Sequence, residues 1–268
     1  MAGISEATTE KYWTERWKEG KTDWHREEVH NILAKYVDEF TGGRSNLRVF
    51  LPLCGKSIDM LWLADQGHTI VGVELAKQAI KRFFKENNLT FTLESVKMAA
   101  GGEPAEVYKC KEKKITIFCC DLFTLKENDV GGKFDAIWDR GSLSAIIPFA
   151  EDRGKGYTKK MRSLLANDGN YMLETHYYEV DRGGEPPASI SDDLRNELYG
   201  EDFDIKELEV HTIPNREFSF TMDLRYYLMK LKANWWRGSG KHEGRDDFSE
   251  GFFVKSLLKG LRPEKLVI

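Results

Sequence analysis

Three short segments carry side chains that could hold an adenosine. The segment PLCGKS (52–57) follows an apolar run and places Gly55 in a turn, and Glu74 ends the next apolar run 19 positions later. At this spacing an acidic side chain can accept hydrogen bonds from both hydroxyls of a ribose. Asp121 and Leu122 end a third run, and they offer one acceptor for an exocyclic amine and one apolar face for a flat ring.

The turn around Gly55 narrows the class of ligand. It has one glycine where a dinucleotide-binding GxGxxG turn has three. No glycine stands five residues before Gly55, as a phosphate-binding GxxxxGK[ST] loop requires. The pattern therefore predicts an adenosine without a pyrophosphate, a description that S-adenosylmethionine fits. The alternative interpretation of Glu74 is an ordinary glutamate at a strand end.

A fourth apolar run ends in WDRGS (138–142), where Arg140 would point at the same cleft. An ion pair with Asp139 or another acid is the alternative role for this arginine. The histidines follow neither HExxH nor another tight metal-ligand spacing, and no GxSxG segment accompanies them, so neither a metal centre nor a covalent nucleophile is predicted. Structural roles are expected for His25, His68, His176 and His211.

The cysteines likewise predict no metal or redox centre. They are Cys54, Cys110, Cys119 and Cys120. None belongs to a CxxC pair, and the two adjacent thiols would point to opposite faces of a strand. We therefore expect small, buried, reduced thiols.

Apolar runs typical of buried strands alternate with helical patterns along the chain. The strand runs are 47–53, 69–75, 115–123, 134–140, 170–178, 203–210 and 224–233, and the helical patterns are 10–19, 26–40, 56–66 and 76–88. Such alternation implies crossover connections and a parallel sheet, so the sequence predicts a doubly wound α/β domain. Its last two strands are expected to pair as an antiparallel hairpin at one edge. Ligands of such sheets bind outside the carboxyl ends of the strands, where the four segments above would meet.

Composition and charge limit the kinds of partner and the cellular compartment that we expect. The 268 residues carry 40 Lys and Arg against 44 Asp and Glu, a net charge of -4, which provides no broad cationic face for nucleic acid. The N-terminus shows no leader pattern, and no run reaches the roughly 18 apolar residues of a membrane span. We therefore expect a cytoplasmic monomer that acts on a small molecule, without nucleic acid or stable membrane association.

Four longer segments, in this order, resemble the thiopurine S-methyltransferase family, and the resemblance covers about residues 10–233. They are EKYWTERWKEGKTDWH (10–25), LRVFLPLCGKSIDMLWLADQGHTIVGVE (47–74), FCCDLF (118–123) and GKFDAIWDRGSLSAI (132–146). The resemblance implies the seven-stranded, Rossmann-like class I methyltransferase fold with its last strand antiparallel. It also implies S-adenosylmethionine as methyl donor, S-adenosylhomocysteine as its product, and a site that needs no metal.

The same resemblance implies the site residues. Cofactor contacts would fall on Trp13, Trp17, Trp24, Leu53, Glu74, Asp121, Leu122 and Arg140. Trp24 and Arg216 would face the acceptor, and Arg140 and Arg216 would act in catalysis by favouring its thiolate. Core packing of the first helix is the alternative role for Trp13 and Trp17. Asp121 stands where the mammalian members have serine, and the segment 181–190 differs in detail.

We therefore predict an S-methyltransferase for aromatic or heterocyclic thiols. Two alternatives stay open: an enzyme for halide, metalloid (Se, Te, As) or small alkyl thiol acceptors, and a non-catalytic methyltransferase-like interaction domain. The expected organisation is one methyltransferase domain over 1–233, whose residues 1–40 form a helical cover, followed by a connector and an amphipathic extension over 234–268. The apolar stripe of this extension predicts a helix that docks on the domain.

Overall fold

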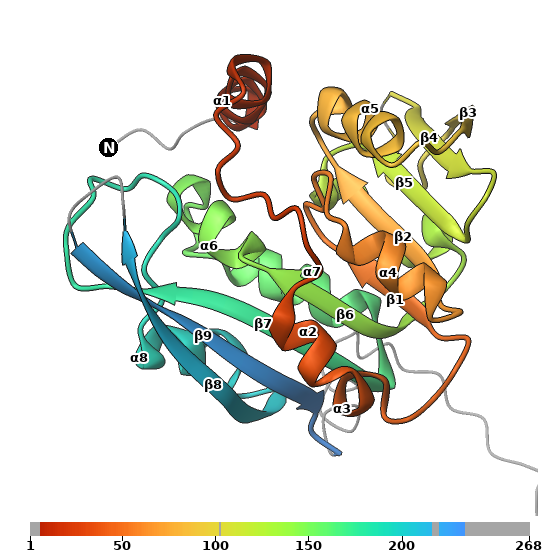
Figure 1. Ribbon diagram of the computed structural model, residues 1–268. Helices are drawn as coiled ribbons and strands as arrows, with labels where there is room; N and C mark the ends of the chain where they lie inside the picture. Colours follow the sequence, from red (N-terminus) through yellow and green to blue (C-terminus); the bar gives the residue numbers. More distant parts are fainter. Residues whose placement is uncertain (1–5, 102, 216–219, 234–268) are drawn as a thin grey trace, which may run out of the picture. The chain divides into compact units, whose positions relative to one another are not determined.

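Residues 6–101, 103–215 and 220–233 are described by a computed structural model of the chain (Figure 1). The chain divides into two units, Met1–Lys232 and Ala233–Ile268. The predicted connector and amphipathic helix at 234–268 lie outside the described residues.

One sheet of nine strands runs through the first unit, in the order β3-β4-β5-β2-β1-β6-β7-β9-β8. The strands are β1 Arg48–Leu51, β2 Thr69–Glu74, β3 Phe91–Val96, β4 Ala105–Cys110, β5 Ile115–Cys119, β6 Phe134–Arg140, β7 Leu165–Tyr177, β8 Phe203–Asn215 and β9 Phe220–Leu231. Strands β5, β2, β1, β6 and β7 pair in parallel, as the predicted crossover connections require. β9 lies antiparallel between β7 and β8, which confirms the predicted terminal hairpin and the antiparallel last strand.

Two unpredicted strands raise the number from the expected seven to nine. β3 and β4 form an antiparallel hairpin, and β4 also pairs antiparallel with β5. β3 reads FTLESV and is exposed at its four central residues, because it is the edge of the sheet. Such an edge strand buries little apolar surface, so its sequence lacks the apolar run by which the seven predicted strands were identified. The class of fold, a doubly wound α/β domain, is the predicted one.

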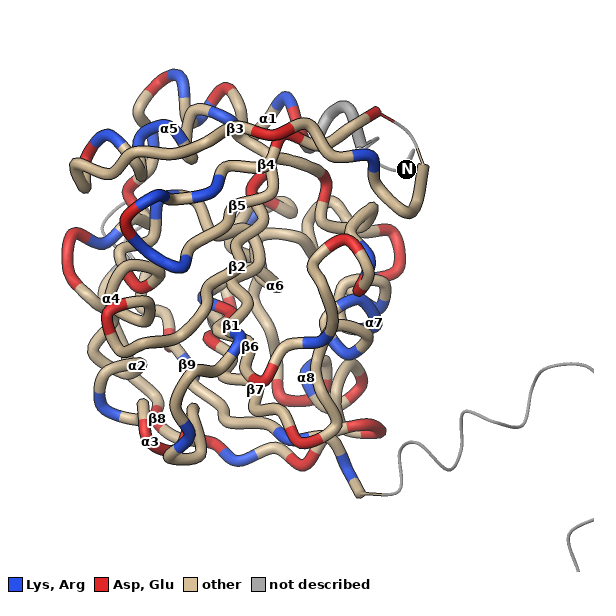
Figure 2. The backbone as a smooth tube through the Cα atoms, turned by 90° about the vertical axis from the view of Figure 1, so that its right-hand side faces the viewer, with Lys and Arg blue, Asp and Glu red and all other residues tan. Residues whose placement is uncertain are grey.

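Acidic and basic residues are interspersed over the helices and loops around the sheet. Figure 2 shows both signs side by side along the described backbone, while the central strands are mostly uncharged. β1 reads RVFL and β5 reads ITIFC, so each buries an almost wholly apolar segment. This distribution agrees with the near-balanced composition of 40 basic and 44 acidic residues.

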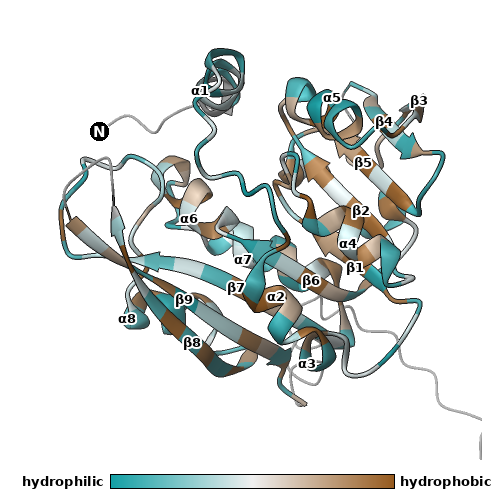
Figure 3. Ribbon diagram, viewed as in Figure 1, coloured by the Kyte–Doolittle hydropathy of each residue, from teal (hydrophilic) through white to brown (hydrophobic). Residues whose placement is uncertain are grey.

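Helices pack on both faces of the sheet and share two apolar clusters with it (Figures 1 and 3). One face carries α2 Asn31–Lys35, α3 Val37–Thr41, α4 Asp59–Asp65 and α5 Lys77–Glu86, and the other carries α6 Ser142–Ile146, α7 Lys155–Leu164 and α8 Asp192–Tyr199. Alternate residues of β1 divide between the faces: Val49 and Leu51 join the first cluster, and Phe50 joins the second. The remaining elements are α1 Glu6–Glu19 and the short 3-10 turns η1 Leu122–Thr124, η2 Glu127–Val130 and η3 Ile147–Phe149.

The helix expected over 26–40 is instead two short helices, α2 and α3, preceded by an irregular segment at 20–30. Tertiary contacts hold that segment out of a helix. The carbonyl oxygen of Trp24 accepts a hydrogen bond from Nη1 of Arg140 at 2.9 Å, and the amide of His30 donates to Oδ1 of Asp59 at 2.8 Å. His30 then caps α2, because its Nδ1 accepts from the Ile32 amide at 3.3 Å. The segment can be followed from α1 to α2 in Figure 1.

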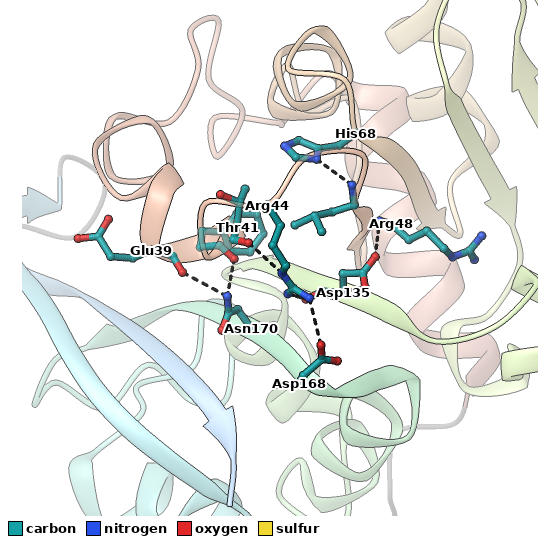
Figure 4. Close-up of polar contacts among 10 residues, drawn as sticks. Glu39, Thr41, Arg44, Arg48, His68, Asp135, Asp168 and Asn170 are labelled. Atoms are coloured by element: carbon teal, nitrogen blue, oxygen red, sulfur yellow. Dashed lines mark hydrogen bonds and ion pairs between the residues drawn. The ribbon is translucent and has the colours of Figure 1, made fainter. Parts of the chain in front are cut away.

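Polar contacts close the amino ends of β1, β6 and β7 (Figure 4). Nη1 of Arg44 lies 3.2 Å from Oδ2 of Asp168, which joins the loop after α3 to β7. Nδ2 of Asn170 donates to the carbonyl oxygen of Phe40 in α3 at 2.9 Å. These contacts hold the amino ends of the strands against α3 and the loop that follows it. The opposite edge, at the carboxyl ends of the strands, is where a site is expected.

Candidate active site

The switch point of the sheet lies between β1 and β6. From β1 the strand order leads to β2 and β5 on one side and to β6 and β7 on the other. In open α/β sheets, ligands bind outside the carboxyl ends of the strands at such a point. A pocket is found there, lined by Leu51, Pro52, Leu53, Cys54, Ser57, Trp138 and Arg140. The segments predicted from the sequence, after β1, β2, β5 and β6, are therefore at one edge of the sheet.

The turn after β1 has an unusual backbone. Leu53 has a φ of 46° and Gly55 a φ of 53°, so two of three consecutive residues adopt the left-handed region. A leucine in this region is strained by about 1–2 kcal/mol, and such residues cluster at ligand sites. Gly55 has a steric reason as well: a Cβ there would lie 2.8 Å from Cε1 of His25. Leu53 lines the pocket, as its predicted cofactor contact requires.

Glu74 joins the two loops that follow β1 and β2. Glu74 is buried, with 7% of the residue exposed. Oε2 accepts from the Gly55 amide at 2.9 Å, and Oε1 accepts from the Ala76 amide at 2.7 Å. Burial raises the pKa of Glu74, and the two backbone amides oppose that shift by favouring the carboxylate. Each oxygen keeps a further lone pair, so the predicted contacts with two ribose hydroxyls are compatible with this geometry.

The loop after β5 holds Asp121 and Leu122, which were predicted to contact an adenine. Oδ1 of Asp121 accepts from the Phe123 amide at 3.0 Å and so caps the turn η1. Leu122 is 3% exposed and packs in the apolar core, where Val71 and Phe118 also lie. Its side chain is thus buried in the core instead of offering an apolar face to the cleft, because the turn directs this apolar residue inward. Contacts of this loop with an adenine ring stay a prediction.

Arg140 occupies the carboxyl end of β6 and lines the pocket. The alternative role predicted for Arg140 was an ion pair with Asp139. In the structure the two residues point to opposite faces of the strand and have different partners. Asp139 accepts from the hydroxyls of Tyr157 and Tyr171, each at 2.6 Å, and from the Ser142 amide at 3.0 Å. Arg140 instead donates to the Trp24 carbonyl, which ties the irregular segment to β6.

Three tryptophans form a cluster beside the glycine turn. The ring centroid of Trp24 lies 5.6 Å from that of Trp13 and 6.2 Å from that of Trp17. Trp17 is 2% exposed and packs with Ala76 and Ala79 from the start of α5. Trp17 thus already has the packing role that was its alternative interpretation, and contact of Trp13, Trp17 and Trp24 with a cofactor stays a prediction.

His25, for which the sequence predicted a structural role, lies over the glycine turn. Its ring centroid lies 4.8 Å from that of Trp17, and its imidazole covers Gly55. Both ring nitrogens are buried, and neither has a hydrogen-bond partner among the described residues. Burial, followed by the charges of Arg140, Lys56 and Arg82, lowers the pKa of His25 to about 3. The glycine turn is therefore covered by a neutral ring with unfilled hydrogen-bonding positions.

This burial predicts an acid-sensitive stability. The folded pKa of His25 lies below the unfolded value of about 6.5, so acid favours the unfolded form, which binds the extra proton. Its contribution is complete above about pH 6.5 and is lost as pH falls towards 3. Between pH 7 and pH 5 the wild type should lose about 2 kcal/mol more unfolding free energy than His25→Phe, as measured by urea denaturation. Equal losses in the two proteins would contradict this assignment.

The sequence analysis also did not predict a buried polar group near the carboxyl end of β7. Glu174 follows Met172 and Leu173 in β7 and is 5% exposed, and its Oε2 lies 3.0 Å from Nε2 of His30. Burial raises the pKa of Glu174, but the hydrogen bond and charge of His30, with His176 and Arg140, bring it down to about 2. An isolated glutamate near the end of a long strand gave no signal, since its partners are remote in sequence.

The family model of thiopurine S-methyltransferase matches residues 8–231. The chain belongs to the thiopurine S-methyltransferase family. The resemblance identified from the sequence is confirmed, and with it the assignment of the chain as a methyltransferase.

Relatives of the thiopurine S-methyltransferase family match most of the chain. A probable thiopurine S-methyltransferase of Danio rerio is 42% identical over 225 residues, which covers 82% of this chain and 94% of the relative. The thiopurine S-methyltransferase of Bos taurus is 39% identical over 224 residues, covering 82% and 89% of the two chains.

Solved structures show the same fold at low identity. A Burkholderia thailandensis 1,6-didemethyltoxoflavin-N1-methyltransferase, solved with bound 1,6-didemethyltoxoflavin and S-adenosylhomocysteine, has a TM-score of 0.58 and 14% identity. The alignment covers 86% of this chain and 91% of that one. A methyltransferase of Anabaena variabilis has a TM-score of 0.53 and 15% identity, with 87% and 99% covered. Both support the predicted class of fold.

The remaining predicted features of this family member can be placed briefly. Arg216 lies outside the described residues. All four cysteines are free, Cys54 is buried and the others are partly buried, and burial raises the pKa of Cys119 to about 11. Within the described ranges, no group of three or more His, Cys, Asp or Glu side chains could hold a metal ion. No helix in that part of the chain is long and apolar enough to span a membrane.

Proposed function

We propose that this thiopurine S-methyltransferase family member transfers the methyl group of S-adenosylmethionine to the sulfur of an aromatic or heterocyclic thiol. The observation that carries the proposal is the family match over residues 8–231, which includes every segment at the carboxyl edge of the central strands. The products would be a methyl thioether and S-adenosylhomocysteine.

The residues at the switch point fit this cofactor. When bound, the cofactor supplies a methyl group already activated by a sulfonium charge. Glu74 offers acceptors to a ribose, and the turn at Gly55 lets the backbone approach closely. The Trp13, Trp17 and Trp24 cluster provides aromatic faces that attract a cation and exclude water. The chain's main task is then to align the donor carbon with the acceptor sulfur.

Arg140 is the residue that we assign to the acceptor's charge. It lines the pocket, and its guanidinium favours an anionic over a neutral thiol nearby. Arg216 is proposed for the same task on family resemblance alone. We further propose that the enzyme acts on a small molecule, as a cytoplasmic monomer, and binds no nucleic acid. Its near-balanced 40 basic and 44 acidic residues support the last point.

A methyl-transfer screen tests the proposal. Thiopurines, thiophenols, small alkyl thiols, sulfide, halides and metalloid oxyanions would each be incubated with S-adenosylmethionine, and mass spectrometry would detect the methylated product. We expect turnover with the aromatic and heterocyclic thiols. Turnover confined to the other acceptors would move the assignment to that alternative. Cofactor binding without any turnover would favour the non-catalytic interaction domain.

Arg140→Lys should reduce kcat/KM for these thiols at least tenfold. The substitution keeps the positive charge but loses the planar fork that bonds to Trp24 while facing the pocket. Arg153→Lys is the matched control, since Arg153 is largely exposed and pairs with Glu197. Steady-state kinetics that show equal rates for the two variants would contradict the role of Arg140.

A further inference from the structure

Three side chains from two neighbouring strands lie on one face of the sheet at the carboxyl ends of β6 and β7. Arg140 in β6 is the register partner of Glu174 in β7. Glu174 and His176 are two residues apart in the same strand, so their side chains point to the same face. This is the face crossed by the irregular segment 20–30, since Trp24 contacts Arg140 and His30 contacts Glu174.

Glu174 brings a buried negative charge to this edge. His30 accepts from the Ile32 amide through Nδ1, which leaves Nε2 as the protonated nitrogen that donates to Glu174. Tyr226 in β9 is the register partner of Glu174 and is also buried. Glu174 is therefore held as a carboxylate beside Arg140. The negative charge of Glu174 offsets part of the positive charge of Arg140, so Arg140 stabilises a nearby thiolate less than it would without this neighbour.

His176 supplies an unused ring at the same place. Its imidazole lies against the loop after β6: a Cβ on Gly141 would be 3.2 Å from its Cε1. Nδ1 is buried and lacks a hydrogen-bond partner among the described residues. The charged groups that face the ring are Glu174 on its own strand, Arg140 on β6 and Arg182 in the following loop. Burial lowers the pKa of His176, which keeps a lone pair available at neutral pH.

We propose that His176 is the general base of the methyl transfer, with Glu174 as the residue that stabilises its charged form. This inference rests on the proposed S-methyltransferase function. As the acceptor sulfur forms its bond to the methyl carbon, its S–H proton passes to a ring nitrogen of His176. The methyl–sulfonium bond breaks, and its electron pair stays on the departing sulfur. The proton then leaves His176 for solvent, so atoms and charges balance.

The charges of the site favour this route. Proton transfer places an imidazolium beside Glu174, so the guanidinium of Arg140 is left to stabilise the negative charge that develops on the sulfur. The structural role expected for His176 from the sequence gives its buried Nδ1 no partner within the described ranges. A neutral base also has an advantage only for thiols that are still protonated when they bind. This dependence on the acceptor's own acidity separates catalysis from packing.

The test compares two acceptors in wild type and His176→Gln. One is an electron-poor arenethiol that is already a thiolate at the assay pH, and the other is a weakly acidic thiol that is still protonated. The variant should lose about a hundredfold or more in kcat with the protonated thiol and less than about threefold with the thiolate. Its rate with the protonated thiol should rise with pH as that thiol ionises. His211→Gln, on β8 and partnered by Glu209, should match the wild type with both acceptors.

Two further measurements keep the outcome decisive. Calorimetry should show unchanged S-adenosylmethionine affinity in His176→Gln, and His176→Asn replaces it if its melting temperature falls sharply. In the ligand-free wild type, the imidazole NMR signal that disappears in the variant should be that of a neutral ring at pH 7. Equal losses with both acceptors, no loss with either, or a protonated ring at pH 7 would overturn the inference. A wild type that methylates no thiol would instead refute the proposed function.

Discussion

Replacing Glu74 with alanine is expected to lower the affinity for S-adenosylmethionine about a hundredfold or more. The carboxylate is proposed to accept hydrogen bonds from two ribose hydroxyls, each worth about 1.5–3 kcal/mol because the acceptor is charged. The variant also loses the bonds from the Gly55 and Ala76 amides, so the glycine turn and the loop after β2 are no longer held together. Titration calorimetry measures the effect directly.

Glu86→Ala is the matched control for this experiment. Glu86 lies in α5 and pairs with Lys56, the residue after Gly55, and the pair is partly exposed to solvent. Exposed pairs contribute about 0–1 kcal/mol, so the control should bind the cofactor almost as the wild type does. Glu74→Gln should fall between the two, since it retains one acceptor oxygen. An unchanged affinity in Glu74→Ala would remove Glu74 from the cofactor site.

Asp139→Ala should destabilise the domain by about 3–5 kcal/mol, because each buried donor left without an acceptor costs about 1–3 kcal/mol. Asp139 is fully buried and accepts from Tyr157, Tyr171 and Ser142 at 2.6–3.0 Å. Without it, two hydroxyls and one backbone amide would be buried with one acceptor fewer. Urea denaturation gives the free energy of unfolding.

Asp139→Asn and Tyr157→Phe test the mechanism behind that loss. Asp139→Asn keeps one acceptor oxygen and should be less damaging than alanine, while Tyr157→Phe removes a single donor and should cost about 1 kcal/mol. A loss below 1 kcal/mol in Asp139→Ala would show that the network contributes little. Because Asp139 precedes Arg140, a destabilised variant should also lose methyl transfer.

The central sheet was predictable because its strands are buried on both faces. LRVFLPL and TIVGVEL form continuous apolar runs, and the helical patterns between them fix parallel pairing. The hairpin of β3 and β4 was missed because β3 alternates little and is mostly exposed. Residues 26–30 were predicted as part of a helix because the hydrogen bond from His30 to Asp59 joins residues far apart in sequence. Local patterns carry no signal for such contacts.

The sequence likewise predicted the position of some residues of the candidate site and not of others. Glu74 and Arg140 were found because each ends an apolar run, where strand ends meet in a parallel sheet. Leu122 was placed in the cleft although the turn η1 directs its side chain into the core. His25 and Glu174 gave no signal, since their importance depends on Gly55 and His30 being brought next to them. The end of a strand can be recognised from the local sequence, but which side chains lie next to each other depends on the tertiary fold.

The irregular segment between α1 and α2 has a kinetic consequence. His25 covers Gly55 in the turn after β1, and the carbonyl of the preceding residue, Trp24, is bound to Arg140 at the end of β6. A displacement of these two adjacent residues therefore uncovers both halves of the site together. We therefore expect a single motion of this backbone segment to open the route for both products, and a motion of this kind can limit the rate of turnover.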